Sequence, residues 1–185
     1  MRRSKRSFGI LAFLAGSVVL PTPGSSQVAQ SGYALPLKLA IEAAAEAIRF
    51  CEVGGYNVTA TVVDASGVVK LQAKGDHSTI HTKDSSFRNA YTIVTMGPIF
   101  KVDTTGRFAE LVAKNPSGPA LSSLPDILPL AGGVAIKRGE EIVAALGVGG
   151  APGGEKDEAC AQAGVAMIRD QVALAPAQAL KSSGN

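Results

Sequence analysis

The chain has few of the side chains that build catalytic and metal centres. Its 185 residues include no tryptophan, two cysteines and two histidines. Neither Cys51 nor Cys160 has a cysteine or histidine close to it in the sequence, which argues against a metal site made from thiolates. No nucleophile elbow and no serine, histidine and acid series is present. The sequence therefore predicts no catalytic residues.

Basic clusters are missing once the N-terminal segment is set apart. Residues 1–29 have the features of an export signal: early basic residues, an apolar segment over residues 8–20, and small residues that suit cleavage after Ser26 or after Ala29. Removing this signal peptide takes away four of the 18 basic residues and none of the 15 acidic ones, so 14 stand against 15 and the net charge is −1. That balance argues against nucleic acid or an anionic membrane surface as a partner.

A second long apolar segment is missing too. Glycine and proline interrupt every other apolar stretch before it reaches the length that spans a bilayer. The roughly 155 residues left after cleavage suit one domain. An alanine- and proline-rich tail over residues 174–185 is expected to be mobile. We therefore expect an exported protein, periplasmic or extracellular, that does not span a membrane.

Export would place both cysteines in an oxidising compartment, where a disulfide is permitted. Each cysteine lies on a predicted helix, so pairing requires those two helices to be neighbours. The sequence leaves two interpretations open: a bridge between Cys51 and Cys160, or two buried free thiols.

Apolar spacing and turn residues predict an alternation of helices and strands. The predicted helices cover residues 37–52, 82–96, 105–113 and 155–172, and the predicted strands cover residues 57–64, 68–74, 127–130, 133–137 and 141–148. Gly97 and Pro98 are expected to end the second helix, and the chain from there to Pro125 is expected to hold one short helix and otherwise irregular backbone. This order favours an α+β fold in which a five-stranded antiparallel sheet carries helices on its faces.

The first and last predicted helices carry apolar stripes at helical spacing. The stripe of the first helix is Leu37, Ile41, Ala44, Ile48 and Cys51, and that of the last is Ala161, Val165, Ile168 and Val172.

The most distinctive segment is residues 144–161, in which an apolar strand, a glycine-rich loop and an acidic helix start follow one another. The loop over residues 149–154 has two interpretations: an anion site made of free backbone amides, or tight packing against the sheet. It lacks the Lys-Ser/Thr ending of a nucleotide-binding P-loop. The acids Glu155, Asp157 and Glu158 are explained by the helix dipole.

These motifs carry a family resemblance. Residues 132–136, with the sequence Gly-Gly-Val-Ala-Ile, and the glycine-rich segment over residues 145–161 resemble the GlcG/HbpS family of haem-binding proteins. Residues 63–67 and the segment from residue 75 to residue 92 fit the same pattern, so the likeness spans a domain over residues 35–173. The resemblance implies a profilin-like subunit that forms homo-oligomers, with exported members that bind haem.

Four positions depart from that family pattern. Asn89 stands where the family usually has lysine, Ala135 where it often has proline, Gly149 where it often has serine, and His77 where glycine is common.

The two histidines are the candidate ligands of haem iron or of another metal, because imidazole is a common axial ligand. The alternative is that His77 and His81 are solvated loop side chains. A zinc site would need Asp76 or Asp84 as a third ligand. The spacing alone does not separate haem from zinc, so the expectation of haem rests on the resemblance.

Side chains after the histidines complete the candidate cofactor site. Phe87, Tyr91 and Met96 would supply an apolar wall or a second axial ligand, with simple core packing as the alternative. Arg88, Lys83 and Lys74 would pair with propionates or be solvated. The candidate cofactor-binding residues are His77, His81, Thr82, Arg88, Tyr91 and Met96.

The leading expectation is an exported haem-binding protein that acts as a carrier, a store or a sensor component. The alternatives are a small-molecule enzyme or enzyme accessory protein of the same fold, and a purely structural oligomer.

Overall fold

The computed structural model describes residues 32–174, so the predicted signal peptide and nearly all of the predicted tail lie outside it. The elements in chain order are α1 (Leu37–Val53), β1 (Thr59–Asp64), β2 (Val69–Lys74), α2 (Thr82–Phe100), α3 (Thr105–Lys114), α4 (Gly118–Ser122), β3 (Gly133–Arg138), β4 (Glu141–Gly149) and α5 (Gly154–Leu174). The strands form one antiparallel sheet in the order β2-β1-β4-β3. This confirms the α+β fold with an antiparallel sheet.

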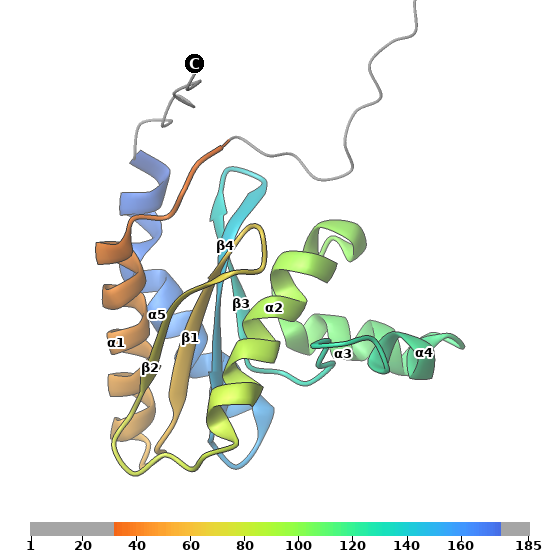
Figure 1. Cartoon of the computed structure of the whole chain (residues 1–185), viewed down its shortest axis with the longest axis horizontal. Coiled ribbons are helices and arrows are strands. Elements are labelled where there is room, and N and C mark those ends of the chain that lie inside the picture. The colour runs from red at the N-terminus through yellow and green to blue at the C-terminus, as the bar shows by residue number, and fades with distance from the viewer. Residues whose placement is uncertain (1–31, 175–185) are drawn as a thin grey trace, which may run out of the picture.

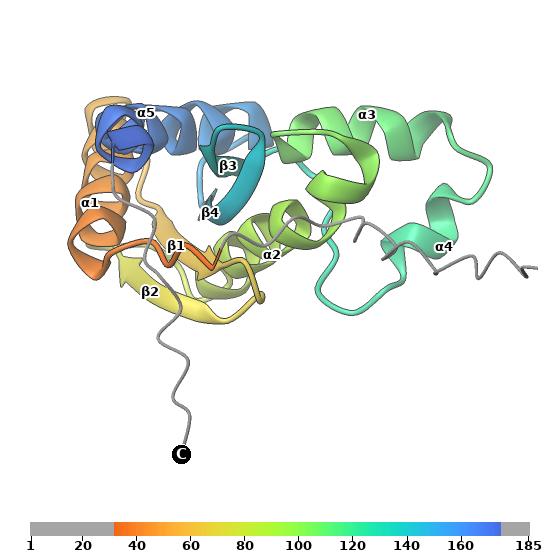
Figure 2. The ribbon, with the colours of Figure 1, turned by 90° about the horizontal axis from the view of Figure 1, so that it is seen from above.

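The helices cover both faces of the sheet. Figure 2 shows α1 and α5 side by side on one face and α2 on the other, with α3 and α4 reaching outward beyond α2. In the part of the chain that the structure describes, no helix combines the length and the apolar character needed to cross a membrane.

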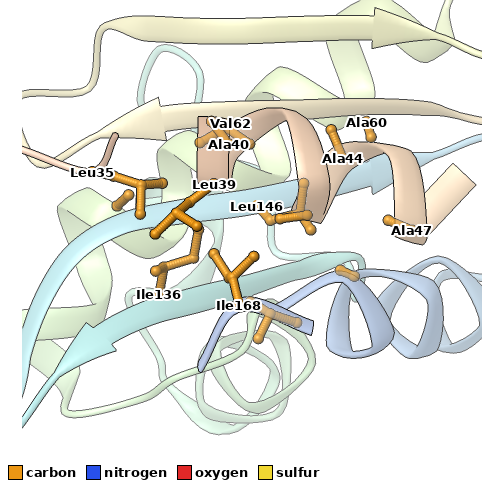
Figure 3. Close-up of a cluster of buried hydrophobic side chains, with 14 of the residues drawn as sticks. Leu35, Leu39, Ala40, Ala44, Ala47, Ala60, Val62, Ile136, Leu146 and Ile168 are labelled. Atoms are coloured by element: carbon orange, nitrogen blue, oxygen red, sulfur yellow. The ribbon is translucent and has the colours of Figure 1, made fainter. Parts of the chain in front are cut away.

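Strand alternation explains why two different cores form. Ala60 and Val62 of β1 face α1 and α5, where they join Leu146 of β4 and Ile168 of α5 in the main core (Figure 3). Thr59, Thr61 and Val63 of β1 face α2 instead.

A disulfide joins the two helices on the main-core face. The Sγ atoms of Cys51 and Cys160 are 2.07 Å apart, and both side chains are buried between α1 and α5. The sequence left open a disulfide or two free thiols, and the structure has the disulfide.

The prediction of a fifth strand over residues 127–130 is wrong, because the sheet has four strands. The apolar side chain that suggested a strand, Ile127, fills a small separate core with Val102, Phe108 and Val112. Pro129 has no N–H to donate to a sheet ladder, and the N–H of Leu130 turns back to the carbonyl of Leu128 at 2.8 Å.

The predicted end of the second helix is also wrong. Helix α2 continues through Gly97 and Pro98 and ends at Phe100, where Lys101 takes a left-handed conformation with φ +53°. A Cβ on Gly97 would lie 2.8 Å from Ile142 and 2.9 Å from the carbonyl of Val102, so this glycine serves close packing and does not end the helix. The sequence predicted irregular backbone at residues 118–122, where the structure has the short helix α4.

The stripe predicted for the first helix is only partly a core face. Ala44 and Cys51 are buried, but Leu37 and Ile41 are 53% and 49% exposed. The buried face of α1 is made mainly of alanines, which let α1 approach the sheet closely. Ile41 and Ile48 instead line a groove with residues of β2, which is described next.

Candidate functional site

The loop between β2 and α2 carries both histidines, and a tight turn begins it. The carbonyl of Gly75 accepts the N–H of Ser78 at 3.2 Å and its hydroxyl at 2.9 Å. His77 is the third residue of this turn and has φ +62°, a conformation that turns normally give to glycine. Its side chain is exposed.

Buried hydroxyls fix the far end of this loop to the sheet. The Thr82 hydroxyl donates to the carbonyl of Thr79 at 2.6 Å and lies 2.7 Å from the Thr59 hydroxyl. One turn later, the hydroxyls of Thr61 and Ser86 are 2.7 Å apart. Thr82 is fully buried, so it anchors the start of α2 and its hydroxyl is already used within the protein.

His81 is the residue immediately before α2 and is exposed. Its Nδ1 lies 2.9 Å from the Thr79 hydroxyl. Because the helix begins only at Thr82, and His77 lies in the preceding turn, the two imidazoles do not share a helical face. They are two separate positions at one end of the molecule.

The glycine-rich loop lies behind His81 and packs against α2. A Cβ on Gly149 would collide with Ser85, and one on Gly150, at φ +137°, would lie 2.6 Å from the carbonyl of Asn57. Asp157 of α5 accepts the N–H of Ala151 at 2.9 Å. The structure thus uses this loop for tight packing, and a carboxylate of the chain itself takes the place of an external anion there.

Asp157 is buried, and its electrostatics link the loop to His81. Burial raises the pKa of Asp157 above its ordinary value, although the N–H groups of Ala151 and Gly150 oppose the rise. The negative charge of Glu155 adds to the rise, whereas the nearby His81 lowers it.

A groove between α1 and β2 ends at the histidine loop. Its volume is about 370 Å³, and its walls are mainly the apolar side chains of Ile41, Ala45 and Ile48 from α1 and of Leu71 and Ala73 from β2. Arg49, Glu52 and Lys74 add charge at its rim. Gly75 and Asp76 close the end of the groove, so His77 follows directly after the last lining residue.

The other predicted site residues lie elsewhere on α2. Arg88 donates to the carbonyl of Ile127 at 2.8 Å, and the ring of Tyr91 packs 5.5 Å from that of Phe87. Met96 packs against the small core beneath α3. At a rise of about 1.5 Å per residue, Tyr91 and Met96 lie roughly 15 and 22 Å along the helix from His81, too far to ligate the same iron.

Among residues 32–174, no group of three or more His, Cys, Asp and Glu side chains could hold a metal ion. The geometry therefore lends no support to the zinc alternative, in which Asp76 or Asp84 would have joined the histidines.

The groove walls were not predicted from the sequence. Leu37, Ile41, Ala45 and Ile48 recur at helical spacing, but the sequence alone assigned most of this stripe to the core. One signal distinguishes the groove-facing residues of this helix from its core-facing residues. The helix has a second stripe, made of alanines and Cys51, and that stripe is the face buried in the core.

Comparisons with known proteins agree with this architecture. The family model described as "Haem degrading protein HbpS-like" matches residues 35–166. A crystal structure of a double mutant of HbpS from Streptomyces reticuli is 31% identical, covers 83% of this chain and 99% of its own, and superposes with a TM-score of 0.68. Comparison with curated proteins finds no match.

Two more distant structures share the fold. Protein ORFY of Klebsiella pneumoniae is 22% identical, covers 80% of this chain and 97% of its own, and has a TM-score of 0.67. A structure titled as a PduOC:heme complex is 21% identical, covers 74% of this chain and 96% of its own, and has a TM-score of 0.65.

Proposed function

Because this chain belongs to the family of HbpS-like haem degrading proteins, we propose that it is an exported haem-binding protein. The observation that carries the proposal is the family match over residues 35–166, which spans the histidine loop and both walls of the groove. The crystal structure of the PduOC:heme complex adds that this fold accommodates haem in another protein.

We propose the groove between α1 and β2 as the haem site, with His77 as the iron ligand. The residues suit the group: an apolar floor for the macrocycle, an exposed imidazole at one end, and Lys74 at the rim for a propionate. Arg49 is less suited to that role because Glu46 already holds its guanidinium at 2.6 and 2.7 Å. Bound haem would supply a redox-active iron, and the protein would supply its orientation and its exclusion from water.

The size of the groove supports an oligomeric site. Ligand sites that enclose a small molecule have volumes of about 300–1,000 Å³. At about 370 Å³ the groove is near the lower limit, so it would hold only part of a porphyrin. We propose that a second copy of the chain covers the rest, which agrees with the half-exposed apolar side chain of Ile41 in the groove wall.

A haemin titration tests the proposal. We expect the purified mature protein to shift the Soret band of haemin and to saturate at a stoichiometric ratio. A spectrum identical to that of free haemin, or one unaffected by the combined substitutions His77→Gly and His81→Gln, would overturn it.

Haem degradation is the second candidate function, and the description of the matching family favours it. This activity would appear as a loss of the Soret band with release of iron when the haem-loaded protein receives ascorbate or hydrogen peroxide. A rate equal to that of haemin bound to serum albumin would leave binding alone as the function.

Export and physiological role are further parts of the proposal. We propose that the protein acts outside the cytoplasm as a haem carrier, store or sensor component. N-terminal sequencing of protein from the producing cell should find a chain that begins at Gln27 or Gln30. A product that retains Met1 would contradict export.

A further inference from the structure

A second cleft lies at the opposite edge of the sheet from the haem groove. It has a volume of about 390 Å³ and runs between β3 and the last turns of α5. Val134 and Ile136 of β3 form one wall, and Val165 and Val172 of α5 form the other. Lys137 and Arg169 stand at the cleft with one opposing carboxylate, that of Asp103.

Of these two cations, Lys137 is already paired. Its ammonium lies 3.2 Å from the carboxylate of Asp103 and 3.4 Å from that of Glu140. The first of these contacts also accounts for Asp103, the one acid among the residues that line the cleft. Lys137 is thus one cation shared by two carboxylates, which leaves it no free charge for a ligand anion.

Arg169 is different, because no carboxylate of residues 32–174 lies within ion-pair distance of it. Its neighbours three and four positions away on α5 are Val165, Ala166, Val172 and Ala173, all apolar. A guanidinium presents five donors in a planar fork that matches a carboxylate. The cleft thus combines apolar walls with one exposed cation, Arg169, that no carboxylate of the described residues reaches.

The hydrogen bonds of β3 exclude a peptide strand as the occupant. Along the outer edge of β3, the N–H of Gly133 donates to the Thr105 hydroxyl at 2.7 Å, and the N–H of Ala135 donates to the carbonyl of Asp103 at 2.8 Å. These donors are the ones that an added strand would need. A small molecule that contacts side chains alone would not need these donors.

We propose that this cleft binds a small amphipathic carboxylate, such as a medium-chain fatty acid. Its apolar chain would lie along Val165 and Ala173, the apolar lining residues of α5 that are not fully buried, and its carboxylate would accept hydrogen bonds from Arg169. The volume suits such a ligand, since it is near the lower limit of small-molecule sites. The inference does not depend on haem binding, because the two sites lie at opposite edges of the sheet.

Octanoate is the probe that tests this proposal, with amide chemical shifts of the full mature chain as the readout. We expect octanoate to shift the amides of residues 165–173. Octylamine has the same chain with the opposite charge, and acetate lacks the chain, so neither should shift them. Arg169→Gln should weaken octanoate binding at least about tenfold, whereas Arg107→Gln, which removes an exposed arginine of α3, should leave it unchanged.

Three results would overturn the proposal. They are octanoate shifts that map outside the cleft, equal affinities for octanoate and octylamine, and an Arg169→Gln variant that binds as the unsubstituted protein does. Repeating the titration with the haem-loaded protein should give the same octanoate affinity, and competition between the two ligands would contradict a separate site.

Discussion

At the scale of the residue, His77 combines an unusual backbone with an exposed imidazole. A left-handed conformation costs a side chain other than glycine about 1–2 kcal/mol, and the chain accepts this cost at the residue that follows the last lining residue of the groove. Nothing in the hydrogen bonds of the turn requires histidine, since the turn uses only the Gly75 carbonyl and Ser78. We infer that the side chain is kept for binding.

The first prediction separates that role from folding. His77→Gly should leave the free energy of unfolding unchanged or raise it by up to about 1 kcal/mol, because glycine relieves the strain while loosening the unfolded chain. His81→Gly is the matched control, and it should lower stability because His81 has φ −66° in the helical region. Urea unfolding measures both variants, and a His77→Gly protein that is the less stable of the two would contradict the account.

The second prediction concerns Asp157, whose raised pKa makes stability depend on pH. The folded protein holds this proton more tightly than the unfolded chain, whose aspartate has a pKa near 3.8. The stability contributed by protonated Asp157 is therefore fully present below about pH 3.8 and is lost as pH rises through the folded pKa. Asp157→Asn keeps an oxygen acceptor for Ala151 without the charge.

Asp157→Asn should thus gain stability relative to the unsubstituted protein as pH rises from about 4 to 7. Urea unfolding at several pH values measures the difference, with Asp170→Asn as an exposed control on the same helix. A difference that moves in the opposite direction would show that the two backbone hydrogen bonds outweigh burial.

At the scale of the element, the position of α2 depends on glycine in β4. A Cβ on Gly147 would collide with the carbonyl of Ser86 and would lie 2.5 Å from the N atom of Ala90. The helix therefore lies on the sheet backbone to backbone, and this contact positions the start of α2 and the histidine loop before it. Neither Ser86 nor Ala90 can move without shifting the whole helix.

The third prediction follows from this contact. Gly147→Ala should lower the free energy of unfolding by more than about 3 kcal/mol, at the upper end of single-substitution effects, because the backbone of α2 must shift. Gly139→Asn, in an open turn with φ +60°, should change stability by less than about 1 kcal/mol. Thermal unfolding compares them, and similar midpoints would contradict backbone-to-backbone packing.

The disulfide between α1 and α5 is a second feature that fixes the elements relative to one another. It links residues 109 positions apart, and closing so long a loop restricts the unfolded chain by about 4–5 kcal/mol in the chain-entropy model. The fourth prediction is that the double variant Cys51→Ala, Cys160→Ala loses about 2–5 kcal/mol of stability but still binds haem. Loss of haem binding by a folded double variant would show that the bridge also shapes the groove.

The elements show how far sequence reasoning reached. Periodicity located four of the five described helices, all but α4, and four of the five strands it proposed, because one-sided burial imposes a regular pattern. It failed at Ile127, where an apolar side chain fills a small core without a strand, and at Gly97, where glycine serves close packing. Both errors have the same cause, since apolar and glycine residues serve tertiary contacts that have no local signature.

The site was predictable in part for a related reason. His77 and His81 could be identified as candidate ligands from the sequence because the chain has no other histidine. The groove beside them could not be located, since it forms between residues 41–52 and 71–76, segments whose pairing is a property of the fold. Grouping Tyr91 and Met96 with the histidines ignored the length of α2, which separates them.

At the scale of the whole molecule, the two edges of the sheet have different surroundings. Strands β2 and β3 are the two edge strands of the sheet (Figure 1). At the β3 edge, the Thr105 hydroxyl and the Asp103 carbonyl accept the outer N–H groups of Gly133 and Ala135. At the β2 edge, the exposed Val69 and Ile41 lie beside the groove that leads to His77. These different surroundings favour the β2 edge as the place where haem and a second copy of the chain would bind.

The most direct test is a parallel haemin titration of the unsubstituted protein, His77→Gly and His81→Gln, followed by the Soret band. If His77 ligates the iron at the end of the groove, His77→Gly should weaken haemin binding at least about tenfold and change the position of the band, whereas His81→Gln should do neither. Equal affinities and identical spectra for all three proteins would contradict this account.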